Sequence, residues 1–178
     1  MESVAKTAKV ITVDGGEFDV PIDALRVSGY FNDFLEDTDQ VSESLDISLF
    51  SVVTKSMMAS VIEFSILVTQ HRAPEISKPI FHQSIYEITS PIFAKFADKY
   101  QDDELCQLIL VADKLNNQAL LELLSAKLAI HIQRMETKEE IRKYFQITQP
   151  FNSAEDEERI KDENEEANEI YCLNDDDD

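Results

Sequence analysis

The chain has 178 residues, 43% of them apolar, and a formal net charge of −20 at pH 7. This length fits one domain, or one domain with a helical extension, and the apolar fraction is enough for a sizeable core. The charge argues against nucleic-acid binding, because phosphate backbones are read by clustered Lys and Arg.

The negative charge is concentrated at the C-terminal end. Residues 152–178 hold 13 acids and 2 bases, a net charge of −11, which is more than half of the total. Such a run is typical of a solvated helix face followed by a frayed tail. The alternative is electrostatic steering toward a basic partner.

Cysteine usage and hydropathy predict the compartment. Cys106 and Cys172 are too few and too far apart for a disulfide framework. Cys106 falls in a helical apolar pattern, where a buried thiol is the usual case. We expect neither a secretory signal nor a membrane span, because basic-then-apolar patterning is missing at the N-terminus and charges or Ser interrupt the apolar runs. A soluble, intracellular protein in a reducing compartment follows.

The N-terminal part predicts a small sheet. Residues 8–13 and 17–22 are short β-rich runs, and Asp14-Gly15-Gly16 between them favours a hairpin turn, since glycine tolerates positive φ. A phosphate loop would need other glycine spacings. A third short strand is predicted over 45–49, where Leu45, Ile47 and Leu49 alternate with polar residues.

Two helices are predicted around this third strand. Residues 23–36 form the first, followed by a polar loop over 37–44, and the apolar positions of this helix are Leu25, Phe31, Phe34 and Leu35. Residues 51–69 form the second, with apolar positions three or four residues apart at Val53, Met57, Val61, Phe64 and Val68. Residues 71–87, interrupted by Pro74 and Pro79, predict a mobile loop.

The remaining chain predicts successive helices. Ser90-Pro91 suits a helix start, with Phe93, Phe96, Ala97 and Tyr100 on one face. Asp102, Asp103 and Glu104 suit the start of the next helix, which carries Leu105, Leu108, Ile109 and Ala112 and ends at Asn116-Asn117. Residues 118–133 follow, with Leu121, Leu124, Leu128 and Ile132 spaced as one helix face.

The C-terminal segment begins with a predicted helix cap. Thr137 and Glu140 have the spacing of a capping box before Ile141 and Phe145. Asn152 and Glu155 have similar spacing before a charged helix through about Asn168, and 175–178 is an acidic tail expected to be disordered. The whole pattern predicts an α+β fold, a small sheet with packed helices and a helical extension.

Catalytic and metal-binding patterns are weak. His71, His82 and His131 lack the spacing of a metal-binding motif and are interpreted as loop or surface residues. The sequence has no Gly-x-Ser-x-Gly elbow, and Cys106 has no partner in the pattern that would lower its pKa. No cofactor or metal is expected. Ile141, Phe145, Ile147 and Phe151 instead form an apolar cluster before the acidic helix, which fits either core packing or a partner groove.

The C-terminal half resembles the Skp family of adaptors. The resemblance rests on DDELCQLILVADKLNNQALLELLSAKLA (102–129), TKEEIRKYFQI (137–147) and the following residues to 164, and more loosely on SGYFNDFLED (28–37) and PIFAKFADKY (91–100). It implies a BTB/POZ-like domain over 1–133, an F-box-binding helical extension over 134–170, and an acidic tail over 171–178. It also implies a non-enzymatic protein of cytoplasm and nucleus that links F-box substrate receptors to a cullin in an SCF-type ubiquitin ligase, promoting protein degradation.

The resemblance also implies which residues contact partners. Each F-box-side residue would supply an apolar wall or anchor for a helical motif. The implied set is Leu105, Leu121, Leu128, Ile132, Ile141, Phe145, Ile147, Phe151 and Ile160. On the cullin side the corresponding residues are Asp113 and Lys114.

Three positions depart from the family pattern. Asp113-Lys114 replaces the usual Asn-Tyr, and Pro91-Ile92-Phe93 replaces Pro-Val-Trp. Glu166 lies near the position of a family Trp in the last helix, a role that Ile170 or Tyr171 could take. The second hypothesis is therefore a module that binds F-box proteins, or a second copy of itself as a homodimer, without a cullin. A third is an unrelated acidic enzyme or chaperone.

Overall fold

A computed structural model describes residues 6–37, 44–148, 158–160 and 162–163. Its sheet has three strands in the order β2-β1-β3. The strands β1 (Thr7–Ile11) and β2 (Glu17–Pro21) pair antiparallel, whereas β3 (Leu45–Asp46) pairs parallel with β1. The predicted hairpin is confirmed.

The hairpin turn also fixes the start of a helix. Gly15 has a φ of 74°, the conformation for which the Asp-Gly pair is suited. The Asp14 carboxylate accepts hydrogen bonds from the Thr12 hydroxyl at 2.6 Å and from the Lys55 backbone N–H at 2.9 Å. Because Lys55 is the first residue of α3 (Lys55–Gln70), this bond satisfies a free N–H at the helix N-terminus. Both bonds favour the ionised carboxylate, and they lower the pKa of Asp14.

The predicted helix over 23–36 is two helices, so this prediction was wrong in its continuity. They are α1 (Ile22–Leu25) and α2 (Gly29–Asp37). The break has a tertiary cause: the Gly29 N–H donates to the Asn116 carbonyl at 2.9 Å, and a Cβ at Gly29 would lie 2.3 Å from the Asn116 side chain. Phe34, expected on the apolar face, is exposed, while Leu25, Phe31 and Leu35 are buried.

The third strand and the long helix are both shorter than predicted. Strand β3 ends at Asp46, and Leu49, expected to be part of it, is 69% exposed in a turn. Helix α3 begins at Lys55 rather than at 51, because Thr54 is its N-cap and accepts from the Met57 N–H. Val53 lies before the helix but is still buried in the core.

The segment between α3 and α4 is irregular, as expected, apart from a 3-10 turn η1 (Ile85–Glu87). Its predicted mobility stays a prediction. Helix α4 (Pro91–Ala97) has Pro at its first position, and Ser90 is the N-cap residue but makes no side-chain capping bond. The part of the cap prediction that concerned the Ser90 side chain was therefore wrong.

The later helices agree closely with the sequence pattern. They are α5 (Asp102–Lys114), α6 (Gln118–Gln133) and α7 (Lys138–Tyr144). The Asn116-Asn117 break is confirmed, and Asn116 adopts a φ of 49°. Residues 158–160 and 162–163 are helical, whereas the predicted cap at Asn152 and the tail at 175–178 lie outside the described residues.

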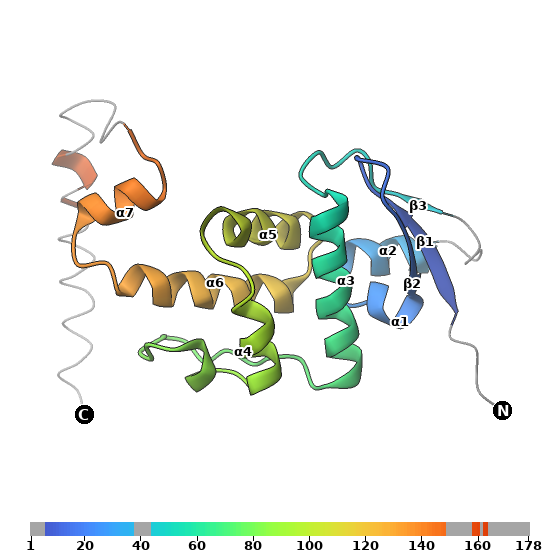
Figure 1. Cartoon of the computed structure of the whole chain (residues 1–178), viewed down its shortest axis with the longest axis horizontal. Coiled ribbons are helices and arrows are strands. Elements are labelled where there is room, and N and C mark those ends of the chain that lie inside the picture. Colours follow the sequence, from blue (N-terminus) through green and yellow to red (C-terminus); the bar gives the residue numbers. More distant parts are fainter. Residues whose placement is uncertain (1–5, 38–43, 149–157, 161, 164–178) are drawn as a thin grey trace. The chain divides into compact units, whose positions relative to one another are not determined.

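The chain forms two compact units, 1–135 and 136–178. In the first, the sheet lies beside α1 and α2, and α3 contacts α1 on one side and α5 on the other (Figure 1). Every fully buried apolar residue of the described chain belongs to this unit. The α+β prediction is confirmed. Among the described helices, none is both long and apolar enough to cross a membrane.

Candidate protein-interaction surface

Helix α6 has two apolar faces. An inner stripe is buried in the core and consists of Leu120, Leu123, Leu124, Ala126 and Ile130. An outer stripe, formed by Leu121, Leu128 and Ile132, is only half-buried. The sequence pattern had placed Leu121, Leu124, Leu128 and Ile132 on one helix face. In the structure Leu124 is buried, whereas the other three, which the resemblance implies on the F-box side, are half-buried. A helix that is apolar beyond its core-facing side retains surface for a partner.

The start of α6 is fixed by a buried polar contact. The Asn117 side-chain oxygen accepts from the Leu120 N–H at 3.2 Å, and its amide donates to the Ser28 hydroxyl at 3.2 Å. Ser28 precedes α2, so one side chain caps α6 and ties it to the turn between α1 and α2. The helix that contains the outer stripe is therefore anchored at its N-terminal end by hydrogen bonds to the rest of the first unit.

A half-buried lysine joins α6 to α4. The Lys127 ammonium donates to the carbonyls of Ala97 and Tyr100, each at 2.7 Å, and lies 3.4 Å from an Asp98 carboxylate oxygen. These carbonyls lie at and just beyond the C-terminal end of α4, where a cation is favoured. Burial disfavours the charged form and lowers the pKa of Lys127, although Asp98 opposes this effect. Sequence reasoning missed Lys127, since a lone lysine in an apolar helix gives no pattern.

Helix α7 exposes most of its apolar side chains. The predicted capping box is confirmed at Thr137, whose hydroxyl accepts from the Glu140 N–H at 3.2 Å. The return bond runs from the Glu136 N–H to the Glu140 carboxylate at 3.0 Å, one residue earlier than predicted. No residue of α7 is fully buried. Ile141 in the helix is half-buried, and Phe145 and Ile147, which follow its C-terminal end, are 38% and 49% exposed, so these side chains reach the surface.

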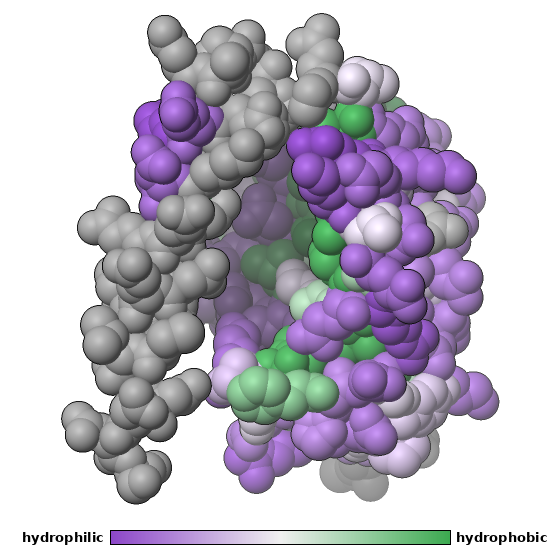
Figure 2. Space-filling model, turned by 90° about the vertical axis from the view of Figure 1, so that its left-hand side faces the viewer, coloured by the Kyte–Doolittle hydropathy of each residue, from purple (hydrophilic) through white to green (hydrophobic). Residues whose placement is uncertain are grey.

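The remaining predicted F-box residues differ in position. Leu105 is 2% exposed and packs in the core, which is a correction, because a side chain at that depth offers no surface to a partner. Ile160 is half-buried, and Phe151 lies outside the described residues. The outer stripe on α6, in the first unit, and the apolar side chains of α7 and the residues after it, in the second, therefore remain as two candidate surfaces. Figure 2 shows hydrophobic side chains reaching the surface among hydrophilic ones on one face.

The predicted cullin-side pair lies at the end of α5. Asp113 and Lys114 are both exposed. Two backbone hydrogen bonds join the turn that follows them to the start of α2. The Leu115 carbonyl accepts from the Tyr30 N–H at 3.2 Å, and the Asn116 carbonyl accepts from the Gly29 N–H at 2.9 Å. Their charged side chains thus lie on an ordered surface beside the start of α2.

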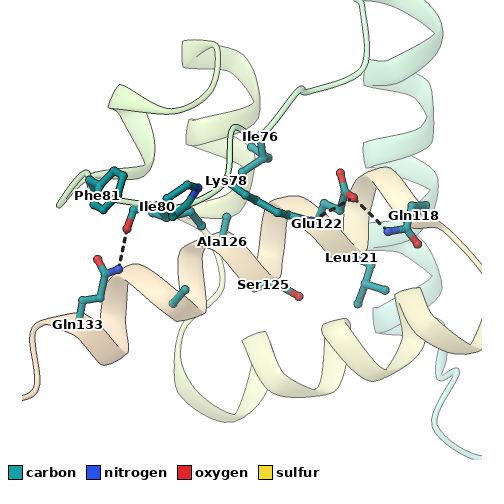
Figure 3. Close-up of a pocket in the computed structure, with 12 residues that line it drawn as sticks. Ile76, Lys78, Ile80, Phe81, Gln118, Leu121, Glu122, Ser125, Ala126 and Gln133 are labelled. Atoms are coloured by element: carbon teal, nitrogen blue, oxygen red, sulfur yellow. Dashed lines mark hydrogen bonds and ion pairs between the residues drawn. The ribbon is translucent and has the colours of Figure 1, made fainter. Parts of the chain in front are cut away.

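A groove on the first unit was not predicted. Residues 72–84, named here the covering loop, run beside α6, and between the two lies a groove of about 720 Å³ (Figure 3). The Gln133 amide donates to the Ile80 carbonyl at 2.8 Å, and Lys78 lies 3.5 Å from Glu122. The available signal was the set of apolar residues Ile76, Ile80 and Phe81 within an otherwise polar loop.

The residue types common in catalysis and metal binding lie as follows. Tyr86, Asp98, Lys127, His131 and Arg134 line a smaller pocket of about 220 Å³ beside α6. His71, His82 and His131 are all exposed, as predicted. Within the described ranges, no three His, Cys, Asp or Glu side chains are grouped to hold a metal. Cys106 is half-buried rather than fully buried, contrary to the expectation for its thiol.

Comparison with known proteins establishes the family. The profile described as "Skp1 family, dimerisation domain" matches residues 118–167. The S-phase kinase-associated protein 1 homolog of Tetrahymena thermophila is 30% identical over 169 residues, which cover 95% of this chain and 98% of that protein. The chain belongs to the Skp1 family.

Family membership has two direct consequences. The three-stranded sheet with packed helices is the BTB/POZ-like fold of the Skp1 family, as the sequence predicted. Members of this family are adaptor proteins rather than enzymes, and they have F-box proteins as partners. At the level of the family, this chain is therefore an SCF-type adaptor.

Proposed function

We propose that this protein links F-box substrate receptors to a cullin scaffold in an SCF-type ubiquitin ligase of the cytoplasm and nucleus. The observation that carries the proposal is that α6 in the first unit and the α7 segment in the second each leave apolar residues at their own surface, in a member of the Skp1 family. The outer stripe of α6 and the exposed apolar residues of α7 have the chemistry that an amphipathic helical motif needs.

The charge of the chain supports a protein partner. With a net charge of −20, the protein attracts partners that carry basic residues near their apolar contacts. Rim charges of this kind accelerate association, whereas the buried apolar anchors determine most of the affinity. We therefore assign the binding energy to the apolar residues and the association rate to the acids.

The first prediction tests the F-box assignment. Ile141→Asp and Phe145→Ala should each weaken the complex with an F-box protein by about 2 kcal/mol or more, roughly thirtyfold in affinity, because each removes an apolar anchor. Titration calorimetry against a panel of F-box fragments measures this effect. Lys143→Ala, an exposed polar position of α7, is the matched control and should bind like the wild type. Absence of binding to every fragment would contradict the proposal.

A second candidate function is F-box binding without a cullin. The exposed Asp113-Lys114 pair favours it, because two opposite charges replace the uncharged Asn-Tyr of the family on the cullin side. Charged side chains at the centre of an interface must lose their water, at a cost that only a matched partner offsets.

A cullin pull-down separates these two functions. Under the leading proposal, the wild-type chain retains a cullin together with an F-box protein. Under the second function, the wild-type chain does not retain a cullin, whereas the double variant Asp113→Asn/Lys114→Tyr does. Strong retention by the wild type rules out the second function, and the F-box affinity should be the same for both proteins.

A further inference from the structure

We infer that the groove between the covering loop and α6 receives an extended segment of the substrate receptor that adjoins its F-box. This inference rests on the proposed function. It adds a second contact site that adjoins the outer stripe and shares Leu121 with it, and it assigns to the covering loop the role of a groove wall.

The groove is continuous with the outer stripe. At 100° per residue, Ala129, Gln133, Glu122 and Ala126 lie on a face of α6 turned roughly 90° from Leu121, Leu128 and Ile132. Leu121 belongs to both surfaces, since it also lines the groove. A receptor bound on the outer stripe therefore holds its adjoining residues next to the groove, at a high effective concentration.

The length of the groove fits a short extended segment. It runs along α6 from Gln118 to Gln133, which is roughly 22 Å at the rise of a helix. About six or seven extended residues match that length.

The lining determines the chemistry of the segment. Ile80 and Phe81 on the loop, and Leu121, Ala126 and Ala129 on α6, supply apolar surface. Phe81 is 82% exposed, which leaves its ring available to a ligand. Figure 3 shows Gln133 at one end reaching the loop and Gln118 at the other end bonded to Glu122. These two amides can bond the backbone of an extended chain. Because the protein is strongly acidic, the segment is apolar and neutral or basic.

Two variants block this site without touching the outer stripe. Ala129→Phe places a large side chain in the groove, and Phe81→Ala removes the exposed ring from its wall. The matched control is Leu49→Ala, which truncates another exposed apolar residue in the turn that follows β3, outside the residues that line the groove. Thermal unfolding of all three should match the wild type, because none of these side chains is in the core.

The experiment compares two fragments of one receptor that bound in the panel test: the F-box alone, and the F-box with ten adjoining residues on each side. Titration calorimetry on the full chain should show at least tenfold tighter binding of the longer fragment. Ala129→Phe and Phe81→Ala should each remove most of that gain and change the affinity for the F-box alone by less than twofold. Leu49→Ala should retain the gain.

The other outcomes overturn the inference in distinguishable ways. Equal affinities of the two fragments for the wild type overturn the groove inference but leave the proposed function intact. Equal weakening of both fragments by Ala129→Phe overturns it too, since the groove is then part of the F-box site. A wild-type dimer that Ala129→Phe converts to a monomer, seen by sedimentation, identifies a second copy as the occupant. Absence of binding by either fragment overturns both proposals.

Discussion

Single side chains fix the points where elements of this fold meet. Asp14 joins the hairpin turn to the first residue of α3, Asn117 joins α6 to the turn before α2, and Lys127 joins α6 to the end of α4. In each case a polar group satisfies backbone atoms that helix ends leave free. The sequence predicted the Asp-Gly turn and the Asn-Asn break, but these partners, 27 to 89 residues away in the chain, follow only from the tertiary structure.

The Asp14 contact predicts a pH dependence. The pKa of Asp14 in the folded protein lies below its ordinary value of 3.8, so its contribution to stability is present above that value and is lost as the pH falls through the folded pKa. Asp14→Asn should therefore be less stable than the wild type by a constant amount from about pH 8 to pH 6, and by a shrinking amount below about pH 4. Urea unfolding at several pH values measures the difference. A difference that grows on acidification would contradict this assignment.

Lys127 allows a second prediction at this scale. Lys127→Met keeps most of the apolar part of the side chain but removes the ammonium that donates to the carbonyls of Ala97 and Tyr100. The Ala97 carbonyl still accepts from the Tyr100 N–H, whereas the Tyr100 carbonyl loses its bond from Lys127. We expect a loss of about 1–3 kcal/mol in the free energy of unfolding, the usual cost of unsatisfied buried polar groups. Chemical denaturation measures the loss, and Lys143→Met, an exposed position on α7, serves as the control. Unchanged stability would show that water replaces the ammonium.

Helix α6 shows what decides orientation at the scale of an element. Its bounds were predicted at 118–133 and are confirmed, because the Asn-Asn break and the apolar content are local signals. The sequence pattern did not select the face that packs in the core, since apolar residues occur on most of the circumference of this helix and period alone cannot distinguish them. In the fold, α6 contacts α5 and α4, and its inner stripe is buried.

The difference in burial between the two stripes of α6 leads to a stability prediction for a matched pair of variants. Leu124→Ala removes a fully buried side chain and should lower the free energy of unfolding by about 2–5 kcal/mol. Leu121→Ala, on the half-buried outer stripe, should lower it by about 1 kcal/mol or less. Denaturant unfolding of both proteins checks the contrast. Similar losses of unfolding free energy for the two variants would mean that both stripes contribute equally to the core, which would contradict the prediction.

At the scale of the whole molecule, the two units differ in how much of the core they hold. The fully buried side chains of the described chain all lie in 1–135, whereas α7 offers half-buried and exposed apolar residues. We therefore expect the first unit to fold by itself and the second to contribute to binding. The predicted boundaries of the domains at 133 and 170 stay predictions.

Truncation after Met135 tests this division. The shortened chain should still unfold cooperatively, with a free energy of unfolding within about 1 kcal/mol of that of the full chain, because the fully buried apolar side chains of the described residues all lie in 1–135. Its F-box affinity should fall below detection, since Ile141 and Phe145 are lost. Circular dichroism and calorimetry measure the two effects. Loss of the cooperative transition would show that residues 136–178 also stabilise the first unit.

The sequence by itself determined the fold class, the order of the elements and the family, because turn residues, helix breaks and apolar periodicity are local, and 102–147 carries the family pattern. For the apolar cluster of Ile141, Phe145 and Ile147 it left core packing and a partner groove both open. Only the tertiary structure decided that Leu105 is in the core, that α1 and α2 are separate, and that the covering loop and α6 form a groove. These features depend on contacts between residues far apart in the chain, and the sequence pattern contains no record of which faces meet.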